Sequence, residues 1–183
     1  MRTLADFALR PARPEDEETV LRWRNSDQVR PYMLNQVLIS VAEHHAWFAM
    51  GFDQNRPSRF VLEHDHDPLG FVHFTHLDGD EWDWSIYVGE PDSPRGTGTA
   101  LGILALDIAF LSLDVQLLRS AVFPTNERAI RLYSRLTFND AVDPPFQLHP
   151  RSYSQKMRQF CLNRTDWFAN RDEVLGRFLQ LLK

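Results

Sequence analysis

Two kinds of hydrophobic pattern divide this chain of 183 residues. Alternation of apolar and polar residues predicts strands at 6–13, 58–64, 69–76, 81–88, 117–123 and 153–162. Within 81–88, one face carries Trp82, Trp84, Ile86 and Val88, and the other carries Asp83, Ser85 and Tyr87. The polar segment 65–68 predicts a turn between two of these strands.

Helical spacing and helix-start signals predict helices between these strands. Pro14 and the acidic residues after it open one helix, and Ser40 with Glu43 forms a capping box for a second helix that ends near Phe48. Further helices are predicted after the glycines at 96–98, at 126–136 with Thr125 or Asn126 as the cap, and at 170–182. The segment 139–150 is predicted to be a surface loop.

The order β-α-α-β-β-β-α-β-α-β-α predicts a mixed sheet covered by helices, an α/β fold of the α+β type. We found no repeat, linker or low-complexity tract, so one domain is expected over residues 1–183.

Composition excludes several classes of function. The formal net charge is -5 and no basic stripe is present, which argues against a nucleic-acid partner. Cys161 is alone and cannot form an internal disulfide, which suits a reducing cytosol. No segment has the length of a membrane span and the first residues lack a signal peptide, so a cytoplasmic protein is predicted. The histidines at 64–76 fall on a predicted hairpin, and no metal is expected.

The segment 94–110, PRGTGTALGILALDIAF, places a glycine-rich turn directly before an apolar helix. The turn lacks the Lys-Ser/Thr of a Walker A motif, and no second βαβ unit surrounds it as in a dinucleotide fold. Backbone N–H groups at a helix N-terminus suit a diphosphate, and Arg95 adds a positive charge. A tight turn without a ligand is the alternative.

A second motif follows in the segment 126–138. Asn126 and Tyr133 are seven residues apart, so two helical turns and about 10 Å separate them along one helix. An Asn amide can bond an extended ligand, and a Tyr hydroxyl can give a proton to a departing thiolate. The alternative is a helix cap and a core aromatic.

Together, RGTGTA and N-x-x-A-x-x-L-Y resemble the motifs of the GNAT N-acetyltransferases, over nearly the whole chain. The resemblance implies a GNAT fold, with a mixed, mostly antiparallel sheet flanked by helices on both faces, and acetyl-CoA as acetyl donor. It further implies Tyr133 as the catalytic acid and a set of cofactor-binding residues, namely Ile86, Tyr87, Val88, Arg95, Gly96, Thr97, Gly98, Thr99, Ala100 and Asn126. Thr137 departs from the glycine usual in the family, which alters a turn rather than the chemistry.

The segment 21–48 contains W-R-N, V-R-x-x-M, a capped E-H and W-F in series. With this series it resembles the UDP-4-amino-sugar N-acetyltransferases of pseudaminic acid biosynthesis. This resemblance implies transfer to the 4-amino group of a UDP-linked 4-amino-4,6-dideoxy-N-acetyl sugar. It also implies an acceptor pocket lined by Arg24, Asn25, Met33, His45, Trp47 and Tyr87. Arg30 and Tyr32 would add charge and aromatic surface, whereas the alternative places the aromatic residues in the core.

In such a reaction the amine attacks the thioester directly, so no enzyme nucleophile is needed. We expect the backbone N–H of Val88 to stabilise the oxyanion and His73 to act as base, with a water relayed to Glu90 or Asp83 as the rival. An N-terminal protein acetyltransferase and a non-catalytic acetyl-CoA-binding module are the alternative functions. The sequence leaves open the acceptor amine, the acyl chain, a homodimer and the role of the last helix.

Overall fold

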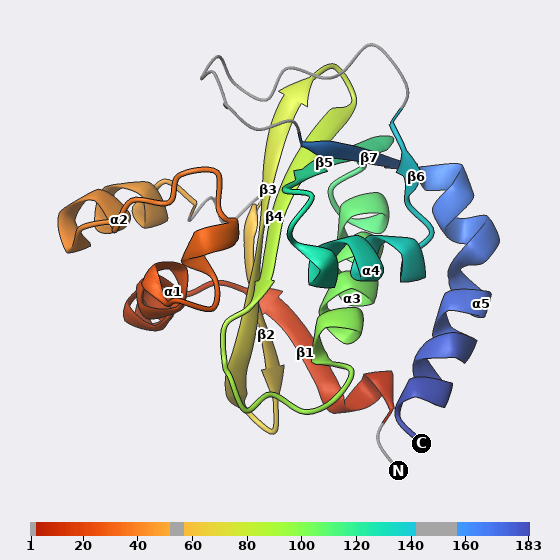
Figure 1. Ribbon diagram of the computed structural model, residues 1–183, viewed down its shortest axis with the longest axis horizontal. Coiled ribbons are helices and arrows are strands. Elements are labelled where there is room, and N and C mark those ends of the chain that lie inside the picture. Colours follow the sequence, from red (N-terminus) through yellow and green to blue (C-terminus); the bar gives the residue numbers. More distant parts are fainter. Residues whose placement is uncertain (1–2, 52–56, 142–156) are drawn as a thin grey trace.

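The computed structural model of the protein describes residues 3–51, 57–141 and 157–183. Its centre is a seven-stranded sheet in the order β1-β2-β3-β4-β5-β7-β6 (Figure 1). The strands are β1 (Phe7–Pro11), β2 (Arg59–His64), β3 (Asp67–Asp78), β4 (Glu81–Val88), β5 (Leu117–Val122), β6 (Asn139–Asp140) and β7 (Arg158–Asn163). Only β4 and β5 pair in parallel, so the sheet is mixed and mostly antiparallel, as predicted.

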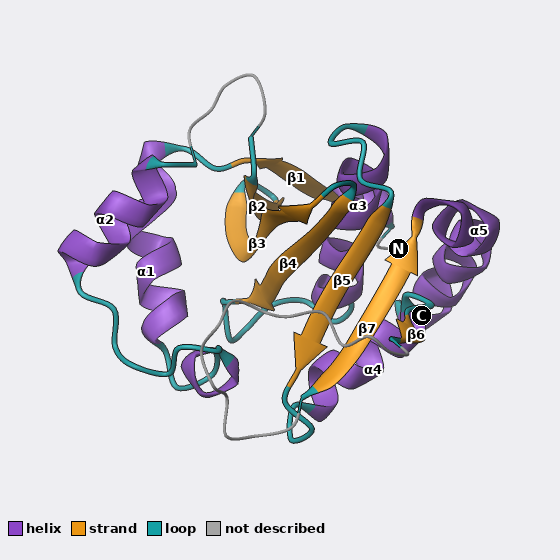
Figure 2. Ribbon diagram, turned by 90° about the horizontal axis from the view of Figure 1, so that it is seen from above, coloured by secondary structure: helices purple, strands orange, loops and turns teal. Residues whose placement is uncertain are grey.

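Helices cover both faces of this sheet, which confirms the predicted fold (Figure 2). The helices are α1 (Glu17–Asn25), α2 (Val41–Ala49), α3 (Thr97–Leu111), α4 (Glu127–Arg135) and α5 (Arg164–Leu181). In Figure 1, α1 and α2 lie on one side of the sheet, and α3, α4 and α5 lie on the other. Among the helices that the structure describes, none combines the length and apolar character that a bilayer-crossing segment needs.

Each face of the sheet has its own hydrophobic core. The larger core joins the sheet to α3, α4 and α5, and it takes in Trp82 and Trp84 from β4. The smaller core joins the sheet to α1 and α2 and includes Trp23 and Phe48, with Tyr87 of β4 packed against it. The alternation predicted along β4 therefore separates two chemically different faces, because successive side chains of a strand point to opposite sides.

The turn between β2 and β3 is shorter than predicted. Asp65 and His66 have φ angles of 52° and 70°, which correspond to a two-residue hairpin turn. Strand β3 therefore starts at Asp67 rather than at residue 69.

The end of the chain also differs from the prediction. Helix α5 begins at Arg164 and not at residue 170, because Asn163 Oδ1 accepts a hydrogen bond from the Asp166 N–H at 2.7 Å and caps the helix there. Strand β7 begins at Arg158, and the predicted strand residues 153–156 lie outside the described residues. Of the predicted loop 139–150, the first two residues form β6, and residues 142–150 also lie outside the described part.

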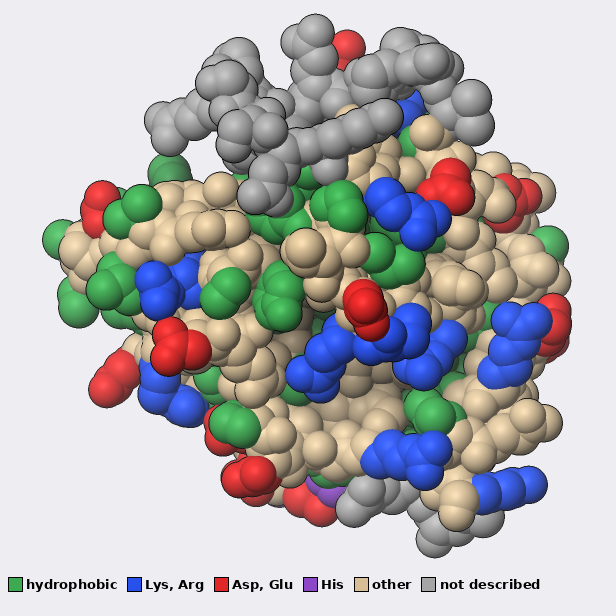
Figure 3. All heavy atoms as spheres, viewed as in Figure 1, with side chains coloured by type: hydrophobic (Ala, Val, Ile, Leu, Met, Phe, Trp, Pro, Cys, Tyr) green, Lys and Arg blue, Asp and Glu red, His purple; other side chains and the backbone are tan. Residues whose placement is uncertain are grey.

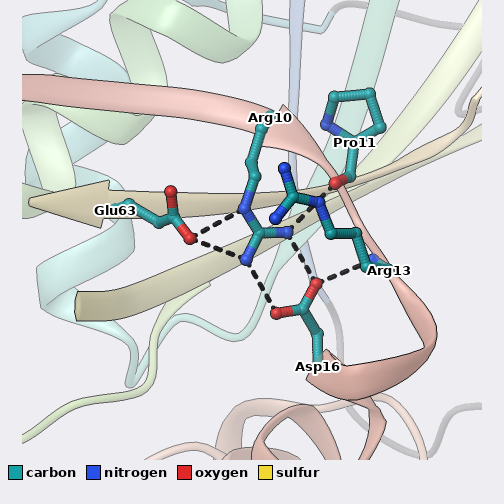
Figure 4. A network of polar contacts seen from close by, with 5 residues as sticks. All are labelled: Arg10, Pro11, Arg13, Asp16 and Glu63. Carbon is teal, nitrogen blue, oxygen red and sulfur yellow. Dashed lines mark hydrogen bonds and ion pairs between the residues drawn. The ribbon is translucent and has the colours of Figure 1, made fainter. Parts of the chain in front are cut away.

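Polar contacts join the start of α1 to the sheet and cap the start of α2. Arg10 of β1 binds Asp16, at the start of α1, through two hydrogen bonds of 2.7 and 2.8 Å, and binds Glu63 of β2 at 2.7 Å (Figure 4). The Ser40–Glu43 capping box predicted for α2 is present, with the Ser40 N–H donating to Glu43 at 2.9 Å.

Candidate active site

Strands β4 and β5 pair at their first residues and then separate. Their pairing runs from Glu81 with Leu117 to Asp83 with Arg119. Residues 84–88 of β4 remain paired with β3 but have no partner strand on the β5 side, and the Val88 carbonyl accepts a hydrogen bond from Gln28 Nε2 at 3.3 Å. This part of β4 therefore offers backbone N–H and C=O groups to a ligand that lies between the two strands.

The hydroxyl of Tyr133 lies at the point where the strands part. Trp84 Nε1 donates to it at 3.1 Å from β4, and Ser120 Oγ forms a hydrogen bond of 2.7 Å with it from β5. Trp84 and Ser120 are the first residues beyond the last paired position. Burial raises the pKa of Tyr133 above its usual range, and the phenol is protonated at neutral pH, as an ordinary tyrosine is.

The predicted diphosphate turn begins α3. Gly96 has a φ of 93°, which favours glycine, and Thr97 fixes the turn by donating from its hydroxyl to the Pro94 carbonyl at 2.7 Å. The first N–H groups of a helix have no acceptor within the helix, so those of Gly98 and Thr99 are available to an anion. A Cβ on Gly98 would lie 3.6 Å from the Val88 side chain, so the turn lies against the unpaired end of β4.

Basic side chains surround this end of the molecule. Arg95 is exposed beside the turn, and α4 carries the exposed residues Arg128, Arg131 and Arg135. Figure 3 shows lysine and arginine side chains gathered across this face. A ligand with several phosphate groups suits such a surface.

Asn126 is a helix cap, the role that the sequence offered as the alternative to ligand binding. It is the N-cap of α4, and its Oδ1 accepts a hydrogen bond from the Ala129 N–H at 3.1 Å. Its side-chain NH₂ makes no hydrogen bond within the described residues and remains available as a donor.

The opposite face of β4 forms a polar row with β2 and β3. His73 of β3 lies between Arg59 of β2 and Ser85 of β4, and Thr75 pairs with Asp83. Burial lowers the pKa of His73 to about 4, with a further lowering by Arg59, so its imidazole is neutral at pH 7. Burial raises the pKa of Asp83 to about 7.

Several predicted acceptor residues meet on this face. Burial raises the pKa of Tyr87 above its usual range, although the nearby charge of Arg24 from α1 lowers it. Arg24 also donates to the Asn35 carbonyl. The Ser85 hydroxyl donates a long hydrogen bond of 4.0 Å to Met33 Sδ. The Trp47 ring lies 5.2 Å from the His73 ring, edge to face.

Two other predicted acceptor residues are used elsewhere. The Asn25 amide holds both backbone groups of Ile39, at 2.8 and 2.9 Å, and so fixes the segment between α1 and α2. His45 is exposed and pairs with Glu17 at 3.1 Å, away from the sheet face. Its neighbour His44 is the buried histidine, with 2% of its surface exposed.

Sequence reasoning did not single out Arg59, His44, Ser120 or Trp84 as site residues. Arg59, Ser120 and Trp84 contact groups far away in the chain, and His44 packs on Trp47 of its own helix, so no spacing in the sequence marks them as site residues. No three His, Cys, Asp or Glu side chains gather as metal ligands would within the described ranges.

The GNAT acetyltransferase domain model matches residues 6–139. The chain belongs to the GNAT acetyltransferase family. Acetyltransferase PseH from Campylobacter jejuni is 23% identical over 124 residues, covering 68% of this chain and 77% of that protein. Spermidine N(1)-acetyltransferase from Escherichia coli is 26% identical over 133 residues, covering 72% of each chain.

Solved structures agree with the GNAT assignment. A spermidine N-acetyltransferase from Vibrio cholerae, in complex with CoA and spermine, superposes with a TM-score of 0.77 at 17% identity, covering 90% of this chain and 99% of that chain. A putative acetyltransferase from Salmonella typhimurium, with acetyl-CoA, gives a TM-score of 0.69 at 16% identity, covering 87% and 94%. This likeness shows the shared fold.

This GNAT protein is therefore an acetyl-CoA-dependent N-acetyltransferase. The residues present fit that co-substrate, because the helix N-terminus of α3, the exposed Arg95 and the unpaired edge of β4 lie at one opening of the sheet. Tyr133 lies at the closed end of that opening.

Proposed function

We propose that this protein acetylates the amino group of a UDP-linked 4-amino-4,6-dideoxy sugar. The observation that carries the proposal is the acceptor face of β4, where Arg24, Tyr87 and Met33 lie together beside the opening between β4 and β5. A guanidinium suits phosphate, and an aromatic ring with a thioether suits the faces of a sugar. The resemblance of residues 21–48 to amino-sugar acetyltransferases supports the same acceptor.

Acetyl-CoA supplies an activated thioester, and the residues of this chain position it. The turn at residues 95–100 holds the diphosphate, residues 86–88 hold the pantetheine by their backbone, and Asn126 donates its free amide hydrogens. The Val88 N–H stabilises the negative charge that develops on the carbonyl oxygen. As the amine nitrogen bonds to the carbonyl carbon and the C–S bond breaks, Tyr133 gives its proton to the sulfur.

Two groups compete for the role of base. His73, expected from the sequence, has a pKa lowered to about 4 by burial, which makes it a weak acceptor for an ammonium proton. Asp83 has a pKa raised to about 7 by burial, which is close to the working pH that general bases need. We therefore propose that Asp83 takes the proton of the attacking amine, with His73 as the alternative.

A polyamine is the second candidate acceptor, because two spermidine acetyltransferases are among the similar proteins. A polycation needs carboxylates to bind it. On this face, Glu63 is already paired with Arg10, and Glu81 is already paired with Arg119. Asp83 is the carboxylate on this face without an ion pair among the described residues, and Arg24 and Arg59 add two cations beside it, which favours the nucleotide sugar over a polycation.

The deciding experiment incubates the protein and acetyl-CoA with a UDP-4-amino sugar, with spermidine or with a peptide bearing a free N-terminus, and follows thiol release. We expect the highest kcat/KM with the UDP-4-amino sugar. Arg24→Met should reduce that value at least tenfold, because it removes a guanidinium from the acceptor face. Arg22→Met is the matched control, since Arg22 belongs to the same helix but has 58% of its side chain exposed. Thiol release with spermidine or the peptide alone would refute the amino-sugar acceptor.

A further inference from the structure

Arg59 is a buried cation with no acidic partner among the described residues. Only 5% of its surface is exposed, and its Nε has no hydrogen-bond partner in the described part of the chain. Burial lowers the pKa of Arg59 to about 10, and no nearby carboxylate opposes this. Because burying an unpaired charge is costly, such a group is expected to have a partner that the free protein does not supply.

The packing around Arg59 fixes the position of its guanidinium. Its Cζ lies 4.2 Å from the centre of the Trp47 ring, a cation–π contact. A Cβ on Gly51 would lie 1.5 Å from Arg59 Nη1, so the backbone at Gly51 packs directly against the guanidinium. Arg59 stands in the same cross-strand row as His73 and Ser85, and two strand spacings put its backbone about 10 Å from that of Ser85.

Two other groups beside Arg59 also lack partners. His44 is 2% exposed, and neither of its ring nitrogens has a hydrogen-bond partner within the described residues. Arg24 Nη1 is likewise buried and without a partner there. Burial lowers the pKa of His44, the charge of Glu17 opposes this, and the charges of Arg59 and Arg24 lower the pKa further. The His44 ring lies 5.5 Å from the ring of Trp47, the same ring that Arg59 contacts.

We propose that Arg59, with Arg24 and His44, forms a subsite for the diphosphate of the acceptor. Two guanidinium groups can each bind phosphate oxygens through paired N–H donors, and the bound charge would neutralise the buried Arg59. The subsite rests on the proposed function and deepens it, because it assigns Arg59 to the diphosphate of the acceptor rather than to its sugar. The acceptor amine would then lie near Asp83 and Ser85, and its diphosphate would lie two strands away.

The test is a calorimetric titration of UDP into the protein at saturating CoA, so that UDP cannot occupy the diphosphate turn of α3. Wild type should bind UDP. Arg59→Met keeps the apolar stem over Trp47 and should weaken binding at least tenfold, whereas Arg59→Lys keeps the charge and should weaken it less. Arg177→Met removes an exposed arginine of α5 and should change nothing.

Correct folding of each variant is checked by its affinity for CoA, which the subsite leaves unchanged. If Arg59→Met fails to fold, Arg24→Met provides the same test at the second guanidinium. The subsite would be overturned if wild type did not bind UDP at saturating CoA. It would also be overturned if wild type and Arg59→Met, or Arg24→Met in its place, bound UDP with equal affinity. The thiol-release assay reports the proposed function separately, because UDP binding without acetyl transfer to the sugar would contradict that function and leave the subsite standing.

Discussion

The Tyr133 hydroxyl bridges two strands that separate beside it, through Trp84 on one strand and Ser120 on the other. Replacement by Phe removes the proposed proton donor but keeps the ring in its stack of aromatic neighbours. We expect Tyr133→Phe to lower kcat about 10²-fold, the usual scale of a lost general acid. The affinity for CoA, measured by calorimetry, should stay the same.

Ser120→Ala is the control for Tyr133→Phe, because it breaks one hydrogen bond to the phenol and leaves the phenol in place. Its kcat should fall less, and its stability should drop by about 1 kcal/mol. A Tyr133→Phe variant with the wild-type rate of thiol release would exclude Tyr133 as the acid.

The pH dependence of kcat separates the two candidate bases. A base works when it is deprotonated, so kcat should rise with pH, pass its midpoint near the pKa of Asp83 of about 7, and level off above it. With His73 as the base, the midpoint would lie near pH 4. We expect Asp83→Asn to remove the midpoint near 7 and His73→Gln to retain it, as measured with both substrates saturating.

Single residues show where sequence reasoning stops. The spacing of Asn126 and Tyr133 was enough to place them on one helix, because helical periodicity is local. Their partners were not predictable, since Ser120 and Trp84 reach Tyr133 only through the pairing of β4 with β5. Arg59 stayed unnoticed for the same reason, because its environment comes from Trp47 and Gly51 of another segment.

At the scale of elements, α5 supports the turn that begins α3, where we propose that the diphosphate binds. A Cβ on Gly96 would lie 2.7 Å from Leu182 Cδ2 and 3.2 Å from the Phe178 ring. Asp107 of α3 also receives two hydrogen bonds from Arg171 of α5, at 2.8 and 2.7 Å. The last helix therefore closes the side of the turn that faces the protein interior.

Gly96→Ala tests this arrangement. The change forces an Ala to a φ of 93° and drives its methyl into α5, so we expect about 2 kcal/mol lower stability and about tenfold weaker CoA binding. Gly79→Ala is a matched control, because Gly79 also has a positive φ, of 53°, but has no atom within 4 Å of the added methyl. Gly79→Ala should lose only the stability that an Ala at a positive φ costs, and it should bind CoA with the wild-type affinity. Equal CoA affinity in both variants, by calorimetry, would contradict the role of α5.

The boundaries of helices and strands could be predicted where their signals lie close together in the sequence. Strands and capping boxes were predictable because alternation and caps lie within a few residues, as in the Ser40–Glu43 box. The start of α5 was misplaced because the apolar stripe used to predict it lies in the second half of the helix, far from the Asn163 cap and from Trp167, which packs against α3. Strand β6 has two residues, too few for any period to appear.

At the scale of the whole molecule, β4 separates the two half-sites that we propose for acetyl-CoA and for the acceptor. Its apolar face belongs to the core that supports the cofactor turn, and its polar face belongs to the side covered by α1 and α2. The two half-sites meet where β4 and β5 part, so an amine held on the polar face can reach a thioester held along the unpaired edge. Positioning of two substrates by one strand is the main contribution such a layout makes to catalysis.

This layout predicts that the half-sites act independently in binding and together in chemistry. Arg24→Met should raise the KM of the acceptor, and Gly96→Ala should raise the Kd of CoA. Gly96 lies against Phe178 of the larger core, whereas Arg24 belongs to α1 on the other side of the sheet. The effects of the double variant on kcat/KM should therefore add to within about 0.5 kcal/mol. The effects of Tyr133→Phe and Asp83→Asn on kcat/KM should instead depart strongly from additivity. The two groups are the proposed acid and base of the same reaction, and the charge of Asp83 acts on the pKa of Tyr133. Coupling above about 1 kcal/mol in the first pair would mean that α1 and the turn of α3 communicate through β4.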